Sequence, residues 1–331
     1  MSDSSADIHL PPIALLQLLA DGELHSGREL ANVLGVSRTA IWKQLAKLEP
    51  LGLELQSQPG KGYCLPGGLD LLEQSKIRLG LLPQVDAAIN NFDLFDVLDS
   101  TNAWLIRQES QPGVSVCIAE CQTAGRGRRG RQWVSPFAHN VYMSLRMTVE
   151  TGFGVLEGLS LAIGVTVADA LGELGVDDIK LKWPNDILWR GRKLGGVLIE
   201  AAGDPSGRCH VVIGLGLNLK AQASMVKDID QPWVALDSIL PAPLARNKAV
   251  ATLLNHIVPL LENYERQGFK PYKLKWEALN AHLNQQVSIQ TGLSQTTGLV
   301  CGVNESGGLM LATEQGVQTF HGGEVSLRAE A

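Results

Sequence analysis

Residues 26–48 contain two short helical segments joined by a glycine turn, and this pattern constrains the fold more tightly than any other stretch. Ser26 followed by Glu29 is a capping box, which predicts the start of the first helix. Gly35 interrupts that helix, and Ser37 is suited to cap a second one in which apolar side chains recur at helical spacing. Helix, short turn and helix together form the helix-turn-helix pattern.

The flanking segments extend this pattern to a small domain. An apolar run at 13–19 predicts a preceding helix, and the chain alternates around Pro-Gly-Lys-Gly at 59–62, which predicts a hairpin with a basic tip. Residues 1–66 are therefore expected to form a winged helix-turn-helix domain. The residues expected to contact DNA are Ser26, Ser37, Arg38, Thr39, Lys43, Gln44 and Lys61.

The charge of this segment leaves a second interpretation open. Residues 37–48 contain three cations and no acid, but residues 1–66 as a whole contain five Lys and Arg against seven Asp and Glu. A winged helix used for protein contact is therefore the alternative to DNA binding.

Strands and helices intermingle from residue 76 to residue 280, without a regular β-α-β alternation. Hydrophobic patterning predicts strands at 92–98, 115–120, 141–147, 179–183, 197–201 and 211–217. Apolar residues at three- to four-residue spacing predict helices at 159–174 and 246–267, the second with a kink at Pro259. Beyond residue 286, short strands separated by turns predict a small β-barrel.

These patterns predict an α+β protein of three domains. The expected division is a winged helix-turn-helix at 1–66, a central mixed-sheet α/β domain at 67–283 and an SH3-like β-barrel at 284–331. No apolar run is expected to span a membrane and no signal-peptide pattern opens the chain, so no membrane partner is expected. The five cysteines have no metal-type spacing, and reduced, buried thiols suit a cytoplasmic protein.

Four arginines and three glycines occupy residues 125–131, in a chain whose net charge is −6. Arginine offers forked donors for phosphate and carboxylate, and glycine lets the backbone approach a ligand closely. We interpret this arginine loop as a segment that closes over a polyanion; a solvated basic loop is the alternative. The loop also matches G-x-G-x-x-G, but that fingerprint must open a helix, and Trp-Val-Ser-Pro follows here.

Three further motifs carry polar groups near the ends of predicted strands. Ser-Thr-Asn at 100–102 begins a helix-like stretch, and Lys-Trp-Pro-Asn-Asp at 182–186 places Lys182 where a proline halts strand pairing. Gly-Leu-Gly-Leu-Asn at 214–218 interrupts a strand with glycines that permit close ligand approach. Each motif has a structural alternative, respectively a helix cap, a turn with a surface lysine, and a β-bulge.

Taken in order, these motifs resemble those of biotin–protein ligases. The resemblance also includes Gln122 before the arginine loop and Arg-Lys-Leu-Gly-Gly at 192–196. With the winged helix in front, residues 10–328 resemble the bifunctional bacterial form, a ligase that also represses the biotin operon. The resemblance implies that biotin and ATP form biotinyl-5′-AMP, that biotin passes to a lysine of the biotin carboxyl carrier protein of acetyl-CoA carboxylase, and that the adenylate-bound homodimer binds operator DNA.

The resemblance also assigns roles by position. It implies that Lys182, Arg126 and Arg128 are catalytic and that Mg²⁺ accompanies ATP, with metal ligands unassigned. The implied biotin and adenylate site comprises Ser100, Thr101, Asn102, Gln122, Gly125, Arg126, Gly127, Arg128, Trp133, Lys182 and Asn218. Three alternatives remain, namely a lipoate ligase on the same scaffold, a ligand-sensing repressor without catalysis, and a ligase that does not repress.

Overall fold

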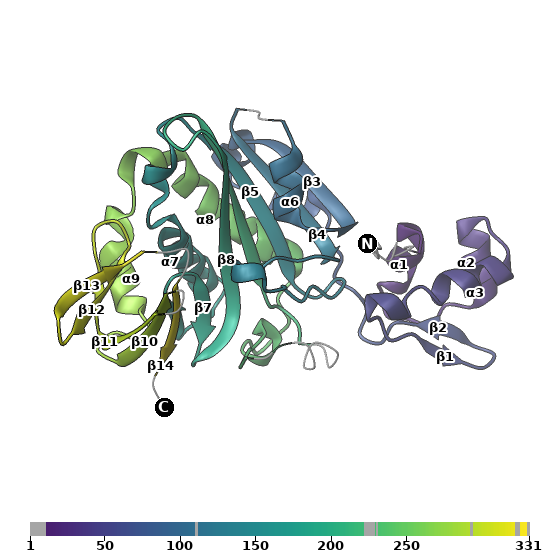
Figure 1. Ribbon diagram of the computed structural model, residues 1–331. Helices are drawn as coiled ribbons and strands as arrows, with labels where there is room; N and C mark the ends of the chain where they lie inside the picture. Colours follow the sequence, from purple (N-terminus) through teal and green to yellow (C-terminus); the bar gives the residue numbers. More distant parts are fainter. Residues whose placement is uncertain are drawn as a thin grey trace, which may run out of the picture.

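A computed structural model describes residues 11–109, 112–221, 229, 231–291, 294–321 and 325–329, the last segment by its backbone only. Figure 1 shows three parts: a helical module on the N-terminal side, a large central sheet with helices, and a small sheet at the C-terminal end. This is the α+β organisation that the sequence predicts.

The central domain is built on a seven-stranded sheet in the order β3-β4-β5-β9-β8-β7-β6. Strands β3 and β4 are parallel, and every other neighbouring pair is antiparallel. The strands are β3 Ile89–Leu98, β4 Val114–Gln122, β5 Val141–Val149, β6 Ile179–Lys182, β7 Asp186–Trp189, β8 Arg192–Gly203 and β9 Cys209–Leu217. All of them except the four-residue β7 are predicted by the sequence.

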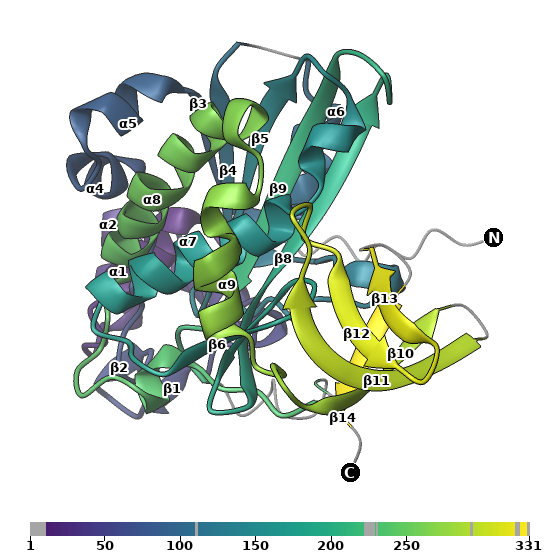
Figure 2. The same cartoon turned by 90° about the vertical axis from the view of Figure 1, so that its left-hand side faces the viewer.

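Helices cover both faces of this sheet. One apolar core joins the sheet to α4 Gln74–Leu79, α5 Pro83–Ala88, α7 Leu159–Glu173, α8 Arg246–Gln267 and α9 Lys273–Leu279. On the opposite face, α6 Thr101–Arg107 contributes Leu105 to a smaller cluster with Cys117 and Val212. Figure 2 shows α7 and α8 side by side over the strands. The two helices predicted for this domain are thereby confirmed, and Pro259 lies inside α8.

The expectation that no apolar run could span a membrane needs correction. Residues Phe153–Glu173 form a segment of 21 residues that is long and apolar enough by composition. Most of α7 is buried, from Leu159 to Leu171, and packs in the core with the sheet and α8. Burial on both the sheet side and the α8 side explains a helix that is apolar around most of its circumference.

The N-terminal module has the predicted winged helix-turn-helix order. Its elements are α1 Ile13–Leu19, α2 Gly27–Leu34, α3 Arg38–Leu45, β1 Gln56–Gln58 and β2 Gly62–Cys64. The Ser26 hydroxyl accepts a hydrogen bond from the Glu29 N–H and the Ser37 hydroxyl accepts one from the Ala40 N–H, each at 3.1 Å. Gly35 adopts φ +63° at the end of α2, a conformation that glycine tolerates well.

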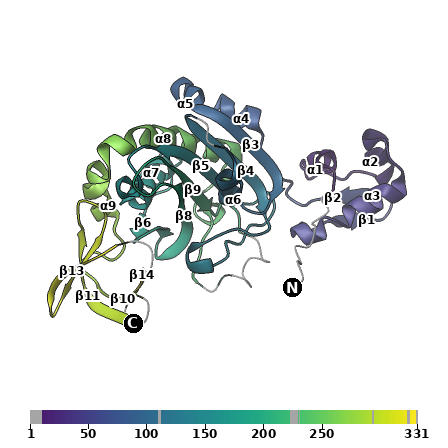
Figure 3. The same ribbon diagram turned by 45° about the horizontal axis from the view of Figure 1, so that its top comes forward.

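The module packs directly on the central domain. Leucines of its helices share an apolar cluster with Cys121, Phe137 and Ala138. After β2 the chain turns back, and the Leu69 N–H donates to the Ala20 carbonyl at 2.9 Å. Figure 3 shows the module beside the β3 and β4 side of the sheet. The stretch at 66–68 is therefore part of a turn held against α1.

The C-terminal part is a small antiparallel β domain, at the position where the sequence predicts an SH3-like β-barrel. Its strand order is β13-β12-β11-β10-β14. The strands are β10 Gln286–Thr291, β11 Ser294–Val303, β12 Leu309–Thr313, β13 Gly316–Phe320 and β14 Val325–Ala329. The indole N–H of the buried Trp183 donates to the Gly307 carbonyl at 3.0 Å, which connects this sheet to the central domain.

A fully buried arginine at the start of α8 holds several distant segments together. The Arg246 guanidinium donates to Glu120 Oε2 at 2.6 Å, to the Asp70 carbonyl at 2.7 Å and to the Asn140 carbonyl at 2.8 Å. Glu120 Oε1 also accepts from the Leu72 N–H at 2.5 Å. The pair thus joins the segment after the module, β4, and the loop before β5 to α8.

Replacing one member of this pair leaves a buried charge without its partner. Glu120→Gln is therefore expected to lower the free energy of unfolding by about 3–5 kcal/mol. Urea denaturation measures the change, with Asp178→Asn in the exposed Arg190–Asp178 pair as the control, expected to lose less than about 1 kcal/mol. Equal losses in the two variants would contradict this account of the core.

Candidate active site

The arginine loop, the Ser-Thr-Asn motif, the Lys-Trp-Pro-Asn-Asp motif and the glycines of β9 all line one cavity of about 330 Å³. The predicted site residues that line it are Ser100, Thr101, Asn102, Gln122, Arg126, Gly127, Arg128, Trp133 and Lys182. Gly125 lines an adjoining cavity behind the loop, and Asn218 lines another that shares Trp133 with the main one. The structure therefore gathers these residues from segments far apart in the sequence.

The Ser-Thr-Asn motif forms the start of α6 and is buried. Ser100 is the N-cap, and its hydroxyl accepts from the Ala103 N–H at 3.4 Å. Gln122 at the end of β4 accepts from the Thr101 N–H at 2.9 Å. Asn102 accepts from the Ser144 hydroxyl of β5 at 2.5 Å. The cap alternative is thus correct for Ser100, but its neighbours form a buried polar network on the cavity wall.

The glycines of β9 make room for side chains from other elements. Strand β9 pairs with β5 and β8 in continuous register, so the β-bulge alternative is wrong. A Cβ atom at Gly214 would overlap the Asn102 amide, and one at Gly216 would overlap the Trp133 indole. The Trp133 indole N–H is buried and has no hydrogen-bond partner among the described residues. Close approach to the backbone, as expected, is the reason for glycine here.

Lys182 is the last residue of β6 and faces the cavity. The chain turns through Pro184, whose carbonyl accepts from the Ser160 hydroxyl at 2.9 Å, and β7 then begins at Asp186. Asn185 donates to the Val197 carbonyl of β8 at 2.8 Å, which fixes the turn against the sheet. The half-buried lysine therefore projects from a rigid turn into the cavity.

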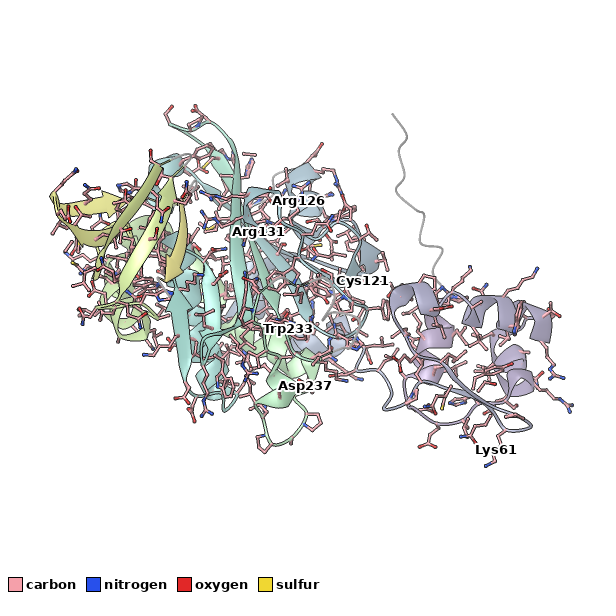
Figure 4. The ribbon with its side chains drawn as sticks, turned by 60° about the horizontal axis from the view of Figure 1, so that its bottom comes forward. Lys61, Cys121, Arg126, Arg131, Trp233 and Asp237 are labelled. Carbon is pink, nitrogen blue, oxygen red and sulfur yellow. The ribbon has the colours of Figure 1, made fainter. Side chains whose placement is uncertain are left out.

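The arginine loop folds back on itself at the cavity mouth. Its Gly127 N–H donates to the Arg131 carbonyl at 2.7 Å, and a short 3-10 turn forms at Arg128–Gly130. No α-helix begins in this described segment, which confirms that the G-x-G-x-x-G match is not a dinucleotide fingerprint. All four arginines line the cavity, and Figure 4 shows Arg126 and Arg131 on the same side of the central domain.

The electrostatics of the loop favour an anion in the cavity. Burial lowers the pKa of the Arg128 guanidinium, and the neighbouring charges of Arg129 and Arg131 lower it further, against the opposing effect of Asp186. Arg128 donates to Asn185 Oδ1 at 3.3 Å. Cationic neighbours that lower the pKa of one guanidinium favour a bound anion beside it.

Two residues near the ligand cavity do not appear in the predicted site: Lys193 lines the main cavity, and Glu200 lines the adjoining one. Lys193 forms an ion pair with Asp186 at 2.7 Å and lies 5.5 Å from the centre of the Trp133 ring. Glu200 binds both Asn102 and Arg126, at 2.8 and 3.2 Å. Lys193 lies in the Arg-Lys-Leu-Gly-Gly motif, which could have indicated it, whereas no local pattern distinguishes Glu200.

The residues predicted to contact DNA lie apart from this cavity. Figure 4 shows Lys61 at the tip of the wing, remote from Arg126 and Arg131. Five of the predicted residues are exposed, namely Ser37, Arg38, Thr39, Lys43 and Lys61. The hydroxyls of Ser26 and Ser37 accept the capping hydrogen bonds, and Gln44 is half-buried. Trp42 exposes 65% of its surface beside Lys43.

Comparison with known proteins places this architecture in a defined class. Residues 94–218 match the model of the Biotin/lipoate A/B protein ligase family, residues 13–64 an HTH domain, and residues 282–328 the Biotin protein ligase C terminal domain. The fold and the site are therefore those of a biotin- or lipoate-type protein ligase with a helix-turn-helix domain in front.

Individual relatives identify the family within this class. The chain is 38% identical to the Bifunctional ligase/repressor BirA of Escherichia coli over 96% of this chain and 97% of that protein. It is 32% identical to the Biotin--[acetyl-CoA-carboxylase] ligase of Paracoccus denitrificans over 69% of this chain and 96% of that protein. A biotin protein ligase from Aquifex aeolicus, solved with biotin and ATP, superposes with a TM-score of 0.63 at 29% identity, covering 73% of this chain and 100% of its own. The chain belongs to the bifunctional biotin–protein ligase and repressor family.

The role of Gly214 can be measured through stability. Gly214→Ala adds a methyl group where the Asn102 amide lies, and overpacking of this kind is expected to lower the free energy of unfolding by about 1–3 kcal/mol. Gly172→Ala is the matched control, because a Cβ atom there meets nothing within 4 Å and the residue lies in α7. The control is expected to gain about 0.5–1 kcal/mol in urea denaturation. A Gly214→Ala protein as stable as the wild type would contradict the proposed contact.

Proposed function

We propose that this protein is an ATP-dependent biotin–protein ligase that forms biotinyl-5′-AMP, transfers biotin to a lysine of the biotin carboxyl carrier protein, and represses biotin-synthesis genes. The observation that carries the proposal is the convergence of Lys182 and the arginine loop on a cavity whose opposite wall is the Ser-Thr-Asn motif. The full-length match to a bifunctional ligase and repressor supports both activities.

The first step joins two anions. When the biotin carboxylate attacks the α-phosphate of ATP, charges about 4 Å apart repel by roughly 4 kcal/mol at an effective dielectric of 20. Lys182, Arg126 and Arg128 line the cavity from two sides and supply the opposing charge. The proposal assigns Lys182 to the carboxylate and α-phosphate oxygens and the two arginines to the phosphates. The adenylate already carries an activated acyl group, so the acceptor lysine can attack it without a covalent enzyme intermediate.

The polar wall favours biotin over lipoate. Ser100, Thr101, Asn102 and Gln122 supply hydroxyl and amide groups, which suit the donors and acceptor of a ureido ring. The dithiolane ring of lipoate has neither the N–H donors nor the carbonyl acceptor of a ureido ring and would gain no hydrogen bonds from this polar wall. Trp133 is assigned to the adenine end because its indole presents an aromatic surface and an unpaired N–H. Asn218 is a weaker candidate, since its amide donates to the Val234 carbonyl at 3.3 Å.

The described residues provide few ligands for Mg²⁺. Asp186 is the carboxylate in the lining of the main cavity, and Lys193 already holds it at 2.7 Å. Across the described ranges, no three His, Cys, Asp or Glu side chains cluster to hold a metal ion. The residues therefore do not form a metal site, and a magnesium ion is assigned to the phosphate oxygens of the substrate.

Repression requires a DNA-binding homodimer. The N-terminal module packs on Cys121, Phe137 and Ala138, which flank Gln122 and the arginine loop in the sequence. Ligand-induced ordering of the loop is proposed to strengthen the dimer and so couple biotinyl-5′-AMP to DNA binding. Carrier protein, operator DNA and nucleotide are all found in the bacterial cytoplasm, which is the proposed location.

The catalytic role of Lys182 can be tested against a control lysine on the same strand. Lys182→Met is expected to slow biotin-dependent adenylation by about 100-fold or more, because it removes a charge aimed at the reacting phosphate. Lys180→Met, two residues earlier on β6, lies outside the main cavity and is expected to keep wild-type activity. ATP–pyrophosphate exchange measures the first step, and mass spectrometry of a carrier domain measures transfer. Absence of biotinylation by the wild-type protein would refute the proposed function.

The DNA-binding assignment predicts a specific salt dependence. Lys43→Ala removes an exposed cation of α3, so the slope of log affinity against log salt should fall by about 0.9. Lys248→Ala, exposed on α8, is the control and should leave the slope unchanged. Gel shifts with a duplex from the promoter of the biotin-synthesis genes, with biotin and ATP present, measure both. If the wild-type protein does not bind this duplex, the repressor part of the proposal is refuted and only the ligase part remains.

A further inference from the structure

Glu200 on β8 joins the polar wall of the cavity to the arginine loop. Its Oε2 atom accepts from Asn102 Nδ2 at 2.8 Å, and its Oε1 atom accepts from the Arg126 guanidinium at 3.2 Å. The carboxylate is only 29% exposed and the Arg126 side chain 48% exposed. One acidic group therefore contacts both sides of the ligand cavity.

The Asn102 amide has one orientation because of Glu200. A carboxylate can only accept hydrogen bonds, so the NH₂ group of Asn102 must face it. The Asn102 oxygen then faces Ser144, whose hydroxyl donates to it at 2.5 Å. Gly214 lies against the same amide and leaves no room for displacement toward β9. The Leu198 carbonyl also accepts from Asn102 Nδ2, but at 3.5 Å, so the shorter contact to Glu200 is the stronger constraint on the amide orientation.

The other end of the contact holds the loop. Arg126 begins the basic run, and its partner Glu200 belongs to a strand at the centre of the sheet. Arg126 also lies near Asp99, where its charge adds to the effect of the Arg107 hydrogen bonds in lowering the pKa of that carboxyl. A second anchor, from Arg128 to Asn185, fixes the far part of the loop. The loop is thus held over the cavity by side chains from the strands beneath it.

We propose that Glu200 is a positioning residue, which orients the Asn102 amide toward the vitamin and holds the arginine loop closed through Arg126. The role of Glu200 toward the vitamin rests on the proposed ligase function, whereas its contact with the arginine loop does not. The proposal assigns Glu200 no contact with the reacting atoms. Its loss should therefore weaken binding of the uncharged part of the ligand and release the loop at its Arg126 end, while Lys182 on β6 and the contact from Arg128 to Asn185 stay in place.

Trypsin measures loop opening directly, because it cleaves after arginine. In the ligand-free chain, Glu200→Gln is expected to be cleaved within residues 126–131 about two- to fivefold faster than the wild type, as loss of a partly exposed ion pair allows. Arg126→Met should accelerate cleavage at the remaining arginines, and the double variant should be no faster than the faster single variant. Glu150→Gln, in an exposed pair with Arg208, is the control. Cleavage of Glu200→Gln at the control rate would overturn the proposal.

Steady-state kinetics distinguish a positioning role of Glu200 from a general loss of structure at the site. Glu200→Gln is expected to raise the KM for biotin about tenfold and the KM for ATP only about two- to threefold, because the Arg126 end of the loop is released while Lys182 and the Arg128–Asn185 contact stay in place. Glu200→Asp keeps the charge but is one methylene shorter, and should show the same pattern in weaker form. Equal changes in both KM values would overturn the positioning role. If the wild type ligates no biotin, the proposed function fails, and the trypsin comparison still decides the loop contact.

Discussion

The ligand site depends on a central strand that lacks side chains at two positions. Strand β9 lies between β5 and β8, and Gly214 and Gly216 leave its surface open where the neighbouring strands are closely packed. Asn102 and Trp133 approach the backbone there and become the two ends of the cavity. Because both glycines keep regular pairing, the sheet provides this space without losing its ladder of hydrogen bonds.

The charge around the cavity determines which ligands the cavity can bind. The chain carries a net charge of −6, yet one end of its central sheet concentrates four loop arginines with Lys182 and Lys193 around one cavity. Burial and the charges of Arg129 and Arg131 lower the pKa of Arg128, so an anion beside this guanidinium is electrostatically favoured. Glu200 and Asn185 hold the loop in place. In the proposed function, a nucleotide phosphate offsets these positive charges and so favours the closed loop.

The sequence predicts those features that depend on local periodicity and local chemistry. Capping by Ser26 and Ser37, the long helices and six of the central strands are confirmed, and the predicted motifs line one cavity. Strand β7 is missed because four residues in a tight hairpin show no usable period. Glu200 is missed because its partners, Asn102 and Arg126, are 98 and 74 residues away. The buried Arg246 is likewise a tertiary feature, since only the fold brings Glu120 and Asn140 to it.

The central claim is that a basic loop and one lysine neutralise the phosphate of an activated vitamin in a space opened by two glycines. A crystal structure of the protein with biotinyl-5′-AMP tests it most directly. The account predicts phosphoryl oxygens about 3 Å from Lys182 Nζ and from a loop guanidinium, with the ureido ring against Asn102 and β9. A phosphoryl group in contact with solvent alone, away from both Lys182 and the loop, would contradict it.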